Sequence, residues 1–202
     1  MGGGADSRIP SILSECLPSS VRMVVRTYDF DPEKAHLQIL SWVEELSPCL
    51  VVGESLGAVH ALRLRGIPHI FVCPAFGAPW RLGLLSYLCV VPGVSSFFSW
   101  LYKPRPGERQ VLHFDRVTLG KYPAHWKDAL GNTPSHGSRD YFFAFFGTKD
   151  HYRRRGVVSV RQYRRLFGES YAIFNGTHFM EEEWVRGMLA DKILEVLEGI
   201  GS

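Results

Sequence analysis

The sequence predicts an α/β fold in which a mostly parallel β-sheet is flanked by helices and carries a helical or irregular cap insertion. Two observations favour this fold class. Short apolar runs alternate with segments of helical periodicity over residues 6–73, and again over residues 141–197. Residues 74–139 between these stretches contain no clear strand and are rich in Pro, Gly, Trp and Tyr, which is typical of a lid. We therefore expect residues 1–202 to form a single domain, with the cap at residues 76–138.

The first half of the chain alternates predicted helices with predicted strands. Helical spacing of apolar residues predicts helices over residues 6–17, from Pro32 to the residue before Pro48, and over residues 56–65. Apolar or β-branched runs predict strands over residues 21–26 (VRMVVR), 49–53 (CLVVG) and 69–73 (HIFVC). The last two runs are continuous, which indicates strands that are buried on both faces. This order favours a parallel sheet with right-handed crossovers.

The alternation resumes after the cap. Strands are expected over residues 141–146 (YFFAFF) and 171–174, and helices over residues 157–167 and 180–197. Inside the cap, residues 82–89 and 123–130 have the composition of helices.

The charge balance argues against a nucleic-acid-binding protein. The 202 residues include 23 Lys+Arg and 20 Asp+Glu, so the net charge is only +3. The single basic run, Arg153–Arg155 with Arg161, Arg164 and Arg165, is interpreted as a solvated helix face. We expect a small molecule as the partner, and no nucleic acid.

The cysteines indicate neither a disulfide framework nor a metal site. None of the four lies in a CxxC pair, and no Cys/His cluster has the spacing of zinc ligands. Cys49 and Cys73 fall in apolar runs, so we interpret them as reduced core residues of a cytoplasmic protein. No cofactor or metal is implied, and residues 1–7 show no secretory signal.

Residues 82–101 raise the question of membrane contact. The segment carries no charge and has the length of a bilayer span, but Pro92 and Gly93 interrupt it and serines dilute its second half. A buried or mobile apolar cap is the favoured interpretation. Surface contact with a membrane and a true span are the alternatives.

The strongest local signal is the motif Gly53-Glu54-Ser55-Leu56-Gly57, of the form G-x-S-x-G, between a predicted strand and a predicted helix. A serine on such a tight turn needs a strained backbone, and the flanking glycines remove the clashes that bulkier side chains would cause. Ser55 can then project above the sheet edge as a nucleophile, while the Leu56 amide faces a developing oxyanion. The alternative is an ordinary turn in which serine caps the helix.

A base and an acid are expected at the same sheet edge. His178 follows the last predicted strand, and Asp150 follows the YFFAFF strand, so both lie at the carboxyl edge that Ser55 occupies. His178 would activate the hydroxyl, and Asp150 would orient the imidazole. Asp115 in the cap competes for the acid role, whereas Asp140 lies at the wrong end of its strand.

Ser55, Asp150 and His178, in this chain order and each after its own strand, resemble the catalytic residues of the α/β-hydrolase superfamily, and the chain is most similar to its small bacterial serine esterases. The resemblance implies cleavage of an ester or thioester through an acyl-enzyme. It also implies that the cap walls an acyl pocket, for which the aromatic candidates are Phe76, Trp80, Phe97, Phe98, Trp100 and Trp126. The alternative for these rings is ordinary packing on the sheet.

One departure from the family pattern concerns the N-terminus. The family's first central strand ends in a His-Gly type loop that supplies a second oxyanion amide, whereas this sequence starts Met1-Gly2-Gly3-Gly4. We expect that the natural protein starts upstream or that this form is truncated, and Gly3 and Gly4 are weak oxyanion candidates. Two other functions stay open: a catalytically impaired hydrolase-fold binding protein, and an acyltransferase that uses the same three residues.

Overall fold

The computed structural model describes residue 4, residues 7–102 and residues 110–201. The chain divides into two compact units. The first comprises Met1–Glu45 and Pro79–His125, and the second comprises Leu46–Ala78 and Trp126–Ser202.

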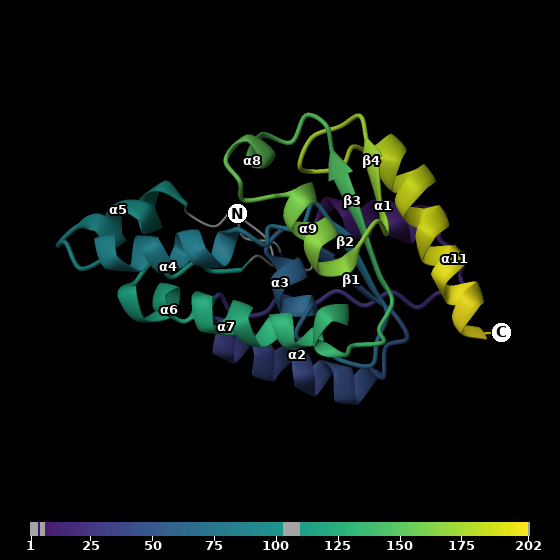
Figure 1. Ribbon diagram of the computed structural model, residues 1–202, viewed down its shortest axis with the longest axis horizontal. Coiled ribbons are helices and arrows are strands. Elements are labelled where there is room, and N and C mark those ends of the chain that lie inside the picture. Colours follow the sequence, from purple (N-terminus) through teal and green to yellow (C-terminus); the bar gives the residue numbers. More distant parts are fainter. Residues whose placement is uncertain (1–3, 5–6, 103–109, 202) are drawn as a thin grey trace. The chain divides into compact units, whose positions relative to one another are not determined.

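The second unit contains a four-stranded parallel sheet (Figure 1). Its strands are β1 (Val51–Glu54), β2 (His69–Val72), β3 (Phe142–Gly147) and β4 (Tyr171–Phe174), in the order β1-β2-β3-β4. Val51 is paired with His69, His69 with Phe142, and Ala144 with Tyr171. The α/β prediction is confirmed, and all four carboxyl ends lie at one edge because every pairing is parallel.

Helices cover both faces of this sheet (Figure 1). On one face, α3 (Gly57–Ala61) and α9 (Val160–Phe167) enclose an aromatic core in which the Phe142 and Phe167 ring centres lie 4.8 Å apart. On the other, α11 (Ala190–Gly201) packs so that Lys192 Nζ lies 4.4 Å from the ring centre of Phe143. The side chains of successive β3 residues, Phe142 and Phe143, thus point to opposite faces of the sheet, as the pleat of a strand requires. The unit also contains η1 (Leu130–Asn132), η2 (Pro134–His136), α8 (His151–Arg154), α10 (Glu182–Trp184) and the π-helical turn η3 (Val185–Leu189).

The first unit is helical. It contains α1 (Arg8–Cys16), α2 (Pro32–Leu46) up to Glu45, α4 (Ala78–Leu88) from Pro79, α5 (Val94–Leu101), α6 (Arg116–Gly120) and the first half of α7 (Tyr122–Ala129). Tyr122 is fully buried, its hydroxyl donates to the Phe30 carbonyl at 2.8 Å, and the two rings lie 5.5 Å apart. Next to it, Lys121 pairs with Asp31 and Glu33, each at 2.7 Å. These contacts join the start of α2 to the segment between α6 and α7 within the unit.

Three predictions about the first half of the chain are wrong. Residues 21–26 form no strand, because they belong to the first unit, whose described residues contain no β-strand with which they could share a ladder. Val52 of β1 is 39% exposed rather than buried, since β1 lies at the margin of the described sheet. Cys49, just before β1, is exposed for the same reason, although all four cysteines are free and Cys73 is buried as expected.

The apolar segment 82–101 is interrupted where the sequence indicates. Helix α4 ends at Leu88 and α5 begins at Val94, after Gly93 in a left-handed conformation with φ +87°. In the described part of the chain, no helix combines the length and the apolar character needed to cross a bilayer. The helices predicted at residues 82–89 and 123–130 are present as α4 and α7.

Candidate active site

Ser55 lies on a strained turn between β1 and α3. Its φ is +52°, in the left-handed region that non-glycine residues rarely adopt. Backbone hydrogen bonds to β2 and to the residues after it hold the turn in place. The Ser55 N–H donates to the Val72 carbonyl at 2.9 Å, and the Ser55 carbonyl accepts from the Ala75 N–H at 3.0 Å. The strain predicted from the G-x-S-x-G motif is therefore present at the serine.

Gly53 allows the close approach that this turn needs. A Cβ at residue 53 would lie 2.8 Å from Ala58 Cα and 3.1 Å from Ala61 Cβ, both on α3. Any larger side chain would push α3 away from β1 and would displace Ser55 with it.

Asp150 follows β3 and is buried, with its carboxylate accepting two hydrogen bonds. Oδ1 accepts from the Tyr152 N–H at 2.8 Å, and Oδ2 lies 2.8 Å from Nδ1 of His178. Burial by itself raises the pKa of this carboxyl, but the hydrogen bonds from His178 and from the Tyr152 amide outweigh it, so the pKa lies below its ordinary value. Asp150 is therefore ionised at neutral pH.

His178 connects Asp150 to Ser55. Since the ionised carboxylate can only accept, Nδ1 of His178 donates to it, and Nε2 then has the lone pair that accepts from Ser55 Oγ at 2.8 Å. His178 is 3% exposed as a residue, and its ring centre lies 4.6 Å from that of Tyr152. The preceding Thr177 N–H donates to the Glu181 carboxylate at 2.9 Å, which fixes the loop that carries the histidine.

The loops that carry Asp150 and His178 touch at Gly147. The Lys149 N–H donates to the Gly176 carbonyl at 2.8 Å, and the Thr148 N–H donates to the Phe174 carbonyl at 2.9 Å. A Cβ at residue 147 would lie 2.4 Å from the Gly176 oxygen, so only glycine fits there. These backbone contacts set the spacing between the carboxylate and the imidazole.

The competing carboxylates have other partners. Asp115 caps α6 by accepting from the Thr118 N–H at 2.8 Å, within the first unit. Asp140 accepts from the Gly66 N–H at 3.1 and 3.0 Å. Of the candidate carboxylates, Asp150 is the one hydrogen-bonded to His178.

The structure places the oxyanion candidates in different parts of the chain. Leu56 directly follows Ser55 in a helical conformation at the start of α3. Gly4 belongs to the first unit, where its N–H donates to Ser7 Oγ, and Gly3 lies outside the described residues. The assignment of Leu56, Gly3 and Gly4 stays a prediction.

The aromatic candidates for a pocket fall into two groups. Phe76 and Trp126 are 1% and 3% exposed, and their ring centres lie 5.0 Å apart in the core, which agrees with the packing alternative. Trp80, Phe97 and Trp100 are exposed members of the first unit, and their role stays a prediction.

Cys73 is a neighbour of the site that sequence reasoning did not identify. It directly follows β2 with φ +45°, and its Sγ lies within 4.8 Å of a carboxylate oxygen of Asp150 and a ring nitrogen of His178. Burial raises the pKa of this thiol, so it stays protonated. The three side chains are of metal-ligand type, but His178 Nδ1 and Asp150 Oδ2 are hydrogen-bonded to each other.

Neither protein-family models nor curated proteins match this sequence. Two solved structures are similar in fold. A monoacylglycerol lipase from Paleococcus ferrophilus aligns with a TM-score of 0.51 and 16% identity, over 84% of this chain and 76% of the lipase chain. The Bottromycin epimerase BotH, solved with Bottromycin A2, aligns with a TM-score of 0.50 and 12% identity, over 96% of this chain and 88% of its own. Both have the α/β-hydrolase fold, and this chain therefore has that fold as well.

Proposed function

We propose that this protein is a serine hydrolase that cleaves a carboxylic ester or thioester, with Ser55 as nucleophile, His178 as general base and Asp150 as the carboxylate that orients it. The observation that carries the proposal is the unbroken series of two 2.8 Å hydrogen bonds, from Ser55 Oγ to His178 Nε2 and from His178 Nδ1 to Asp150 Oδ2. A serine hydroxyl is hardly ionised at neutral pH, and a positioned base is what makes it nucleophilic.

In the first half-reaction, Ser55 Oγ attacks the acyl carbonyl carbon as its proton passes to His178 Nε2. The carbonyl oxygen gains the negative charge, for which the backbone N–H of Leu56 is the expected donor. Collapse of the tetrahedral species breaks the bond to the leaving alkoxide or thiolate. His178 protonates this group, and Ser55 is left acylated.

In the second half-reaction, water takes the place of the departed alcohol or thiol. His178 Nε2 accepts a proton from the water as its oxygen attacks the acyl carbon, and it then returns a proton to Ser55 Oγ as the acid leaves. Asp150 keeps the Nδ1–H tautomer throughout and stabilises the imidazolium, because its lowered pKa keeps the carboxylate charged.

The comparisons support the fold and not a particular reaction. One similar structure is described as a lipase and the other as an epimerase, so the fold alone does not select the reaction. The hydrogen-bonded serine is the feature that favours covalent acyl transfer over simple binding.

Covalent labelling with a fluorophosphonate probe tests the proposal directly, because the probe reacts with activated serines. We expect one label per chain, located on the Ser55 peptide by mass spectrometry, and none on Ser55→Ala. The matched control is Ser170→Ala, which removes an exposed serine of the same unit and should label like the wild type. A folded wild type that does not label, or equal labelling of Ser55→Ala, would refute the nucleophile assignment.

Turnover of p-nitrophenyl esters separates the remaining functions. We expect Ser55→Ala and His178→Ala each to lower kcat by roughly 10³-fold or more, and the double variant to be little worse than either single one. An acyltransferase would label in the same way, but added alcohol would divert the acyl group into a new ester. A binding protein would neither label nor turn over the esters.

A further inference from the structure

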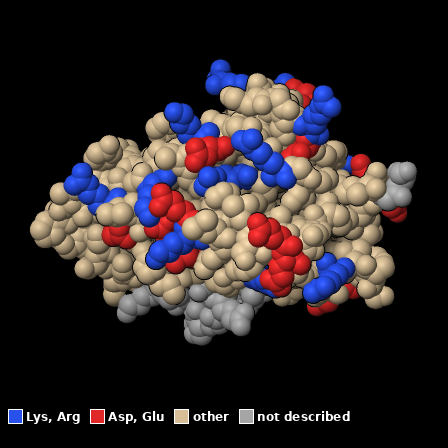
Figure 2. All heavy atoms as spheres, turned by 90° about the horizontal axis from the view of Figure 1, so that it is seen from below, with Lys and Arg blue, Asp and Glu red and all other residues tan. Residues whose placement is uncertain are grey.

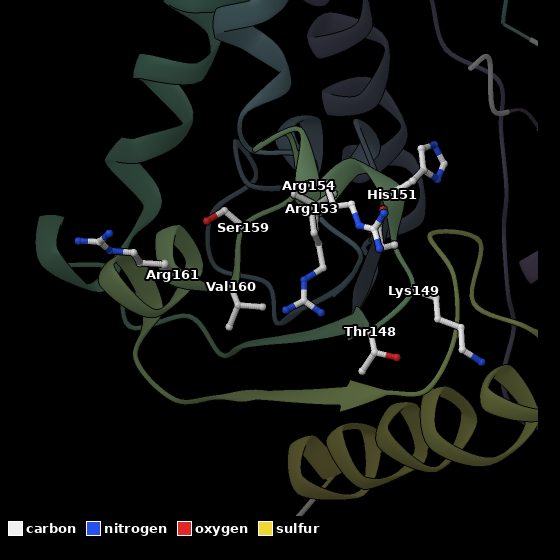
Figure 3. Close-up of a pocket in the computed structure, with 10 residues that line it drawn as sticks. Thr148, Lys149, His151, Arg153, Arg154, Ser159, Val160 and Arg161 are labelled. Carbon is white, nitrogen blue, oxygen red and sulfur yellow. The ribbon is translucent and has the colours of Figure 1, made fainter.

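A basic hollow lies beside Asp150 in the second unit (Figure 3). It measures about 850 Å³, and it is bounded by the end of β3, by α8 and by the start of α9. Its lining contains four permanently charged cations and a single carboxylate. The cations are Lys149, Arg153, Arg154 and Arg161, and the carboxylate is Asp150.

Among the residues that the structure describes, the four cations have no carboxylate partner in an ion pair. Elsewhere in the molecule, Arg63 pairs with Asp128, Lys121 with Asp31, and Arg164 with Glu169. Within the described ranges, none of the four cations around the hollow takes part in an ion pair. The lining therefore carries more positive than negative charge, and an external anion would relieve the repulsion between the cations.

Arg153 gives the hollow a fixed centre. Its Nη1 donates to the Gly147 carbonyl at 2.9 Å, so the guanidinium is held while the rest of its fork stays available. In Figure 3 this guanidinium lies between Val160 and Thr148, whereas Arg161 and Lys149 extend at opposite sides of it. The held arginine can therefore orient an anion in the hollow.

The single carboxylate does not cancel this positive charge. The Asp150 side chain is completely buried, and both of its oxygens accept hydrogen bonds, from the Tyr152 N–H and from His178. The groups that an incoming ligand meets are thus the guanidinium and ammonium groups, together with the first turn of α9, where the helix dipole also favours negative charge.

We propose that this hollow binds a phosphate group, carried by a phosphomonoester or present as inorganic phosphate. A phosphate brings close to two negative charges and three acceptor oxygens, which suits several arginine forks better than one carboxylate does. On the face drawn in Figure 2, basic and acidic side chains are interspersed, which does not favour an extended polyanion on that face. The inference does not depend on the proposed hydrolase activity. Asp150 belongs to both sites, but the cations that would bind phosphate have no part in the proposed reaction, and binding is measured directly.

Isothermal titration calorimetry at constant ionic strength, in a chloride background, tests the site with two probes. Inorganic phosphate represents the free ion, and phenyl phosphate represents a monoester. We expect saturable binding of one molecule per chain, with the tighter probe identifying the source of the phosphate. Absence of saturable heat with both probes would overturn the proposal, and so would binding of a duplex oligonucleotide without binding of either probe.

Charge-neutralising variants locate the site. Arg153→Gln should weaken binding about tenfold or more, because it removes a charge-assisted bond at the centre. Arg165→Gln is the matched control: it removes the same charge from an exposed arginine of α9 outside the hollow, and it should change affinity by about twofold at most. Equal weakening by the two variants would show a diffuse charge effect and would refute the site.

A second pair of substitutions covers the case in which Arg153→Gln does not fold, since Arg153 also bonds the Gly147 carbonyl. Arg154 and Arg161 line the hollow, and both are exposed. The double variant Arg154→Gln/Arg161→Gln should therefore fold and should weaken phosphate binding about fivefold or more. Unchanged binding by this folded double variant would contradict the proposal.

Discussion

Replacing Gly147 with alanine should disturb both the stability of the sheet unit and the spacing of Asp150 and His178. The added Cβ would lie 2.4 Å from the Gly176 oxygen and 2.5 Å from the Thr177 oxygen. Both are backbone atoms, so no side-chain rotation can relieve the contact. The loop after β4 has to move by about 1 Å before these distances reach ordinary van der Waals contact.

The cost follows from what that movement breaks. Overpacking of a tight site costs about 1–3 kcal/mol, and the bonds from the Lys149 N–H to the Gly176 carbonyl and from the Thr148 N–H to the Phe174 carbonyl contribute about 1 kcal/mol each. We therefore expect a loss of about 3–5 kcal/mol in the free energy of unfolding, a large part of the roughly 5–15 kcal/mol typical of a domain.

Urea unfolding followed by circular dichroism measures this loss, and the fluorophosphonate labelling rate of the folded variant reports the spacing of the site. The matched control is Gly199→Ala in α11, where an added Cβ meets no atom within 4 Å and should stabilise the helix by about 0.5–1 kcal/mol. A Gly147→Ala protein as stable as the wild type, with an unchanged labelling rate, would refute the reasoning from close approach.

Three further predictions concern the carboxylate, the core and the thiols. The pKa of Asp150 lies below its ordinary value of 3.8, so its contribution to stability is present above that pH and is lost as the pH falls through the lowered pKa. Asp150→Asn should therefore lose less stability between neutral and acid pH than the wild type does, as urea unfolding midpoints measured across this range can show. The same pH dependence in both proteins would contradict this prediction. Phe76→Ala should lower the free energy of unfolding by about 3–5 kcal/mol in urea titrations, because Phe76 is 1% exposed and belongs to the aromatic core. A loss below about 1 kcal/mol would contradict this prediction and would mean that the core rearranges to fill the cavity. Iodoacetamide at about pH 8 should modify exposed Cys49 in the folded protein and Cys73 only after unfolding, as peptide mass spectrometry can show; equal rates in the folded state would be inconsistent with the burial of Cys73.

The sheet and the three hydrogen-bonded residues could be predicted because the signals for them are local. A continuous apolar run such as residues 69–73 or 141–146 identifies a buried strand without knowledge of its neighbours, and both runs are strands in the structure. Parallel pairing then brings the residues that follow each strand to one edge, which is why Ser55, Asp150 and His178 could be grouped. Their hydrogen bonds agree with that grouping, while their catalytic role stays a prediction.

The features that sequence reasoning missed depend on partners far away in the chain. A β-branched run such as residues 21–26 is a strand only if another strand pairs with it, and the described residues of its unit contain none. Aromatic composition does not say whether Phe76 faces a pocket or a core. The proximity of Cys73 to Asp150 follows from the register of β2 against β3, which cannot be predicted from the sequence. The positive charge of the basic hollow likewise depends on which basic side chains form no ion pair within the described part of the chain, and the sequence does not show this.

The strand order also sets how far the imidazole has to reach. Ser55 follows β1 and His178 follows β4, at opposite margins of the described sheet, whereas Asp150 follows β3, the immediate neighbour of β4. Adjacent strands lie about 4.8 Å apart and are rotated by about 20° relative to each other, so a change in twist alters the margin-to-margin distance more than the distance between neighbours. On warming, the hydrogen bond between Ser55 and His178 should therefore break before the one between His178 and Asp150. Any activity that depends on Ser55 should then be lost at a lower temperature than the secondary structure.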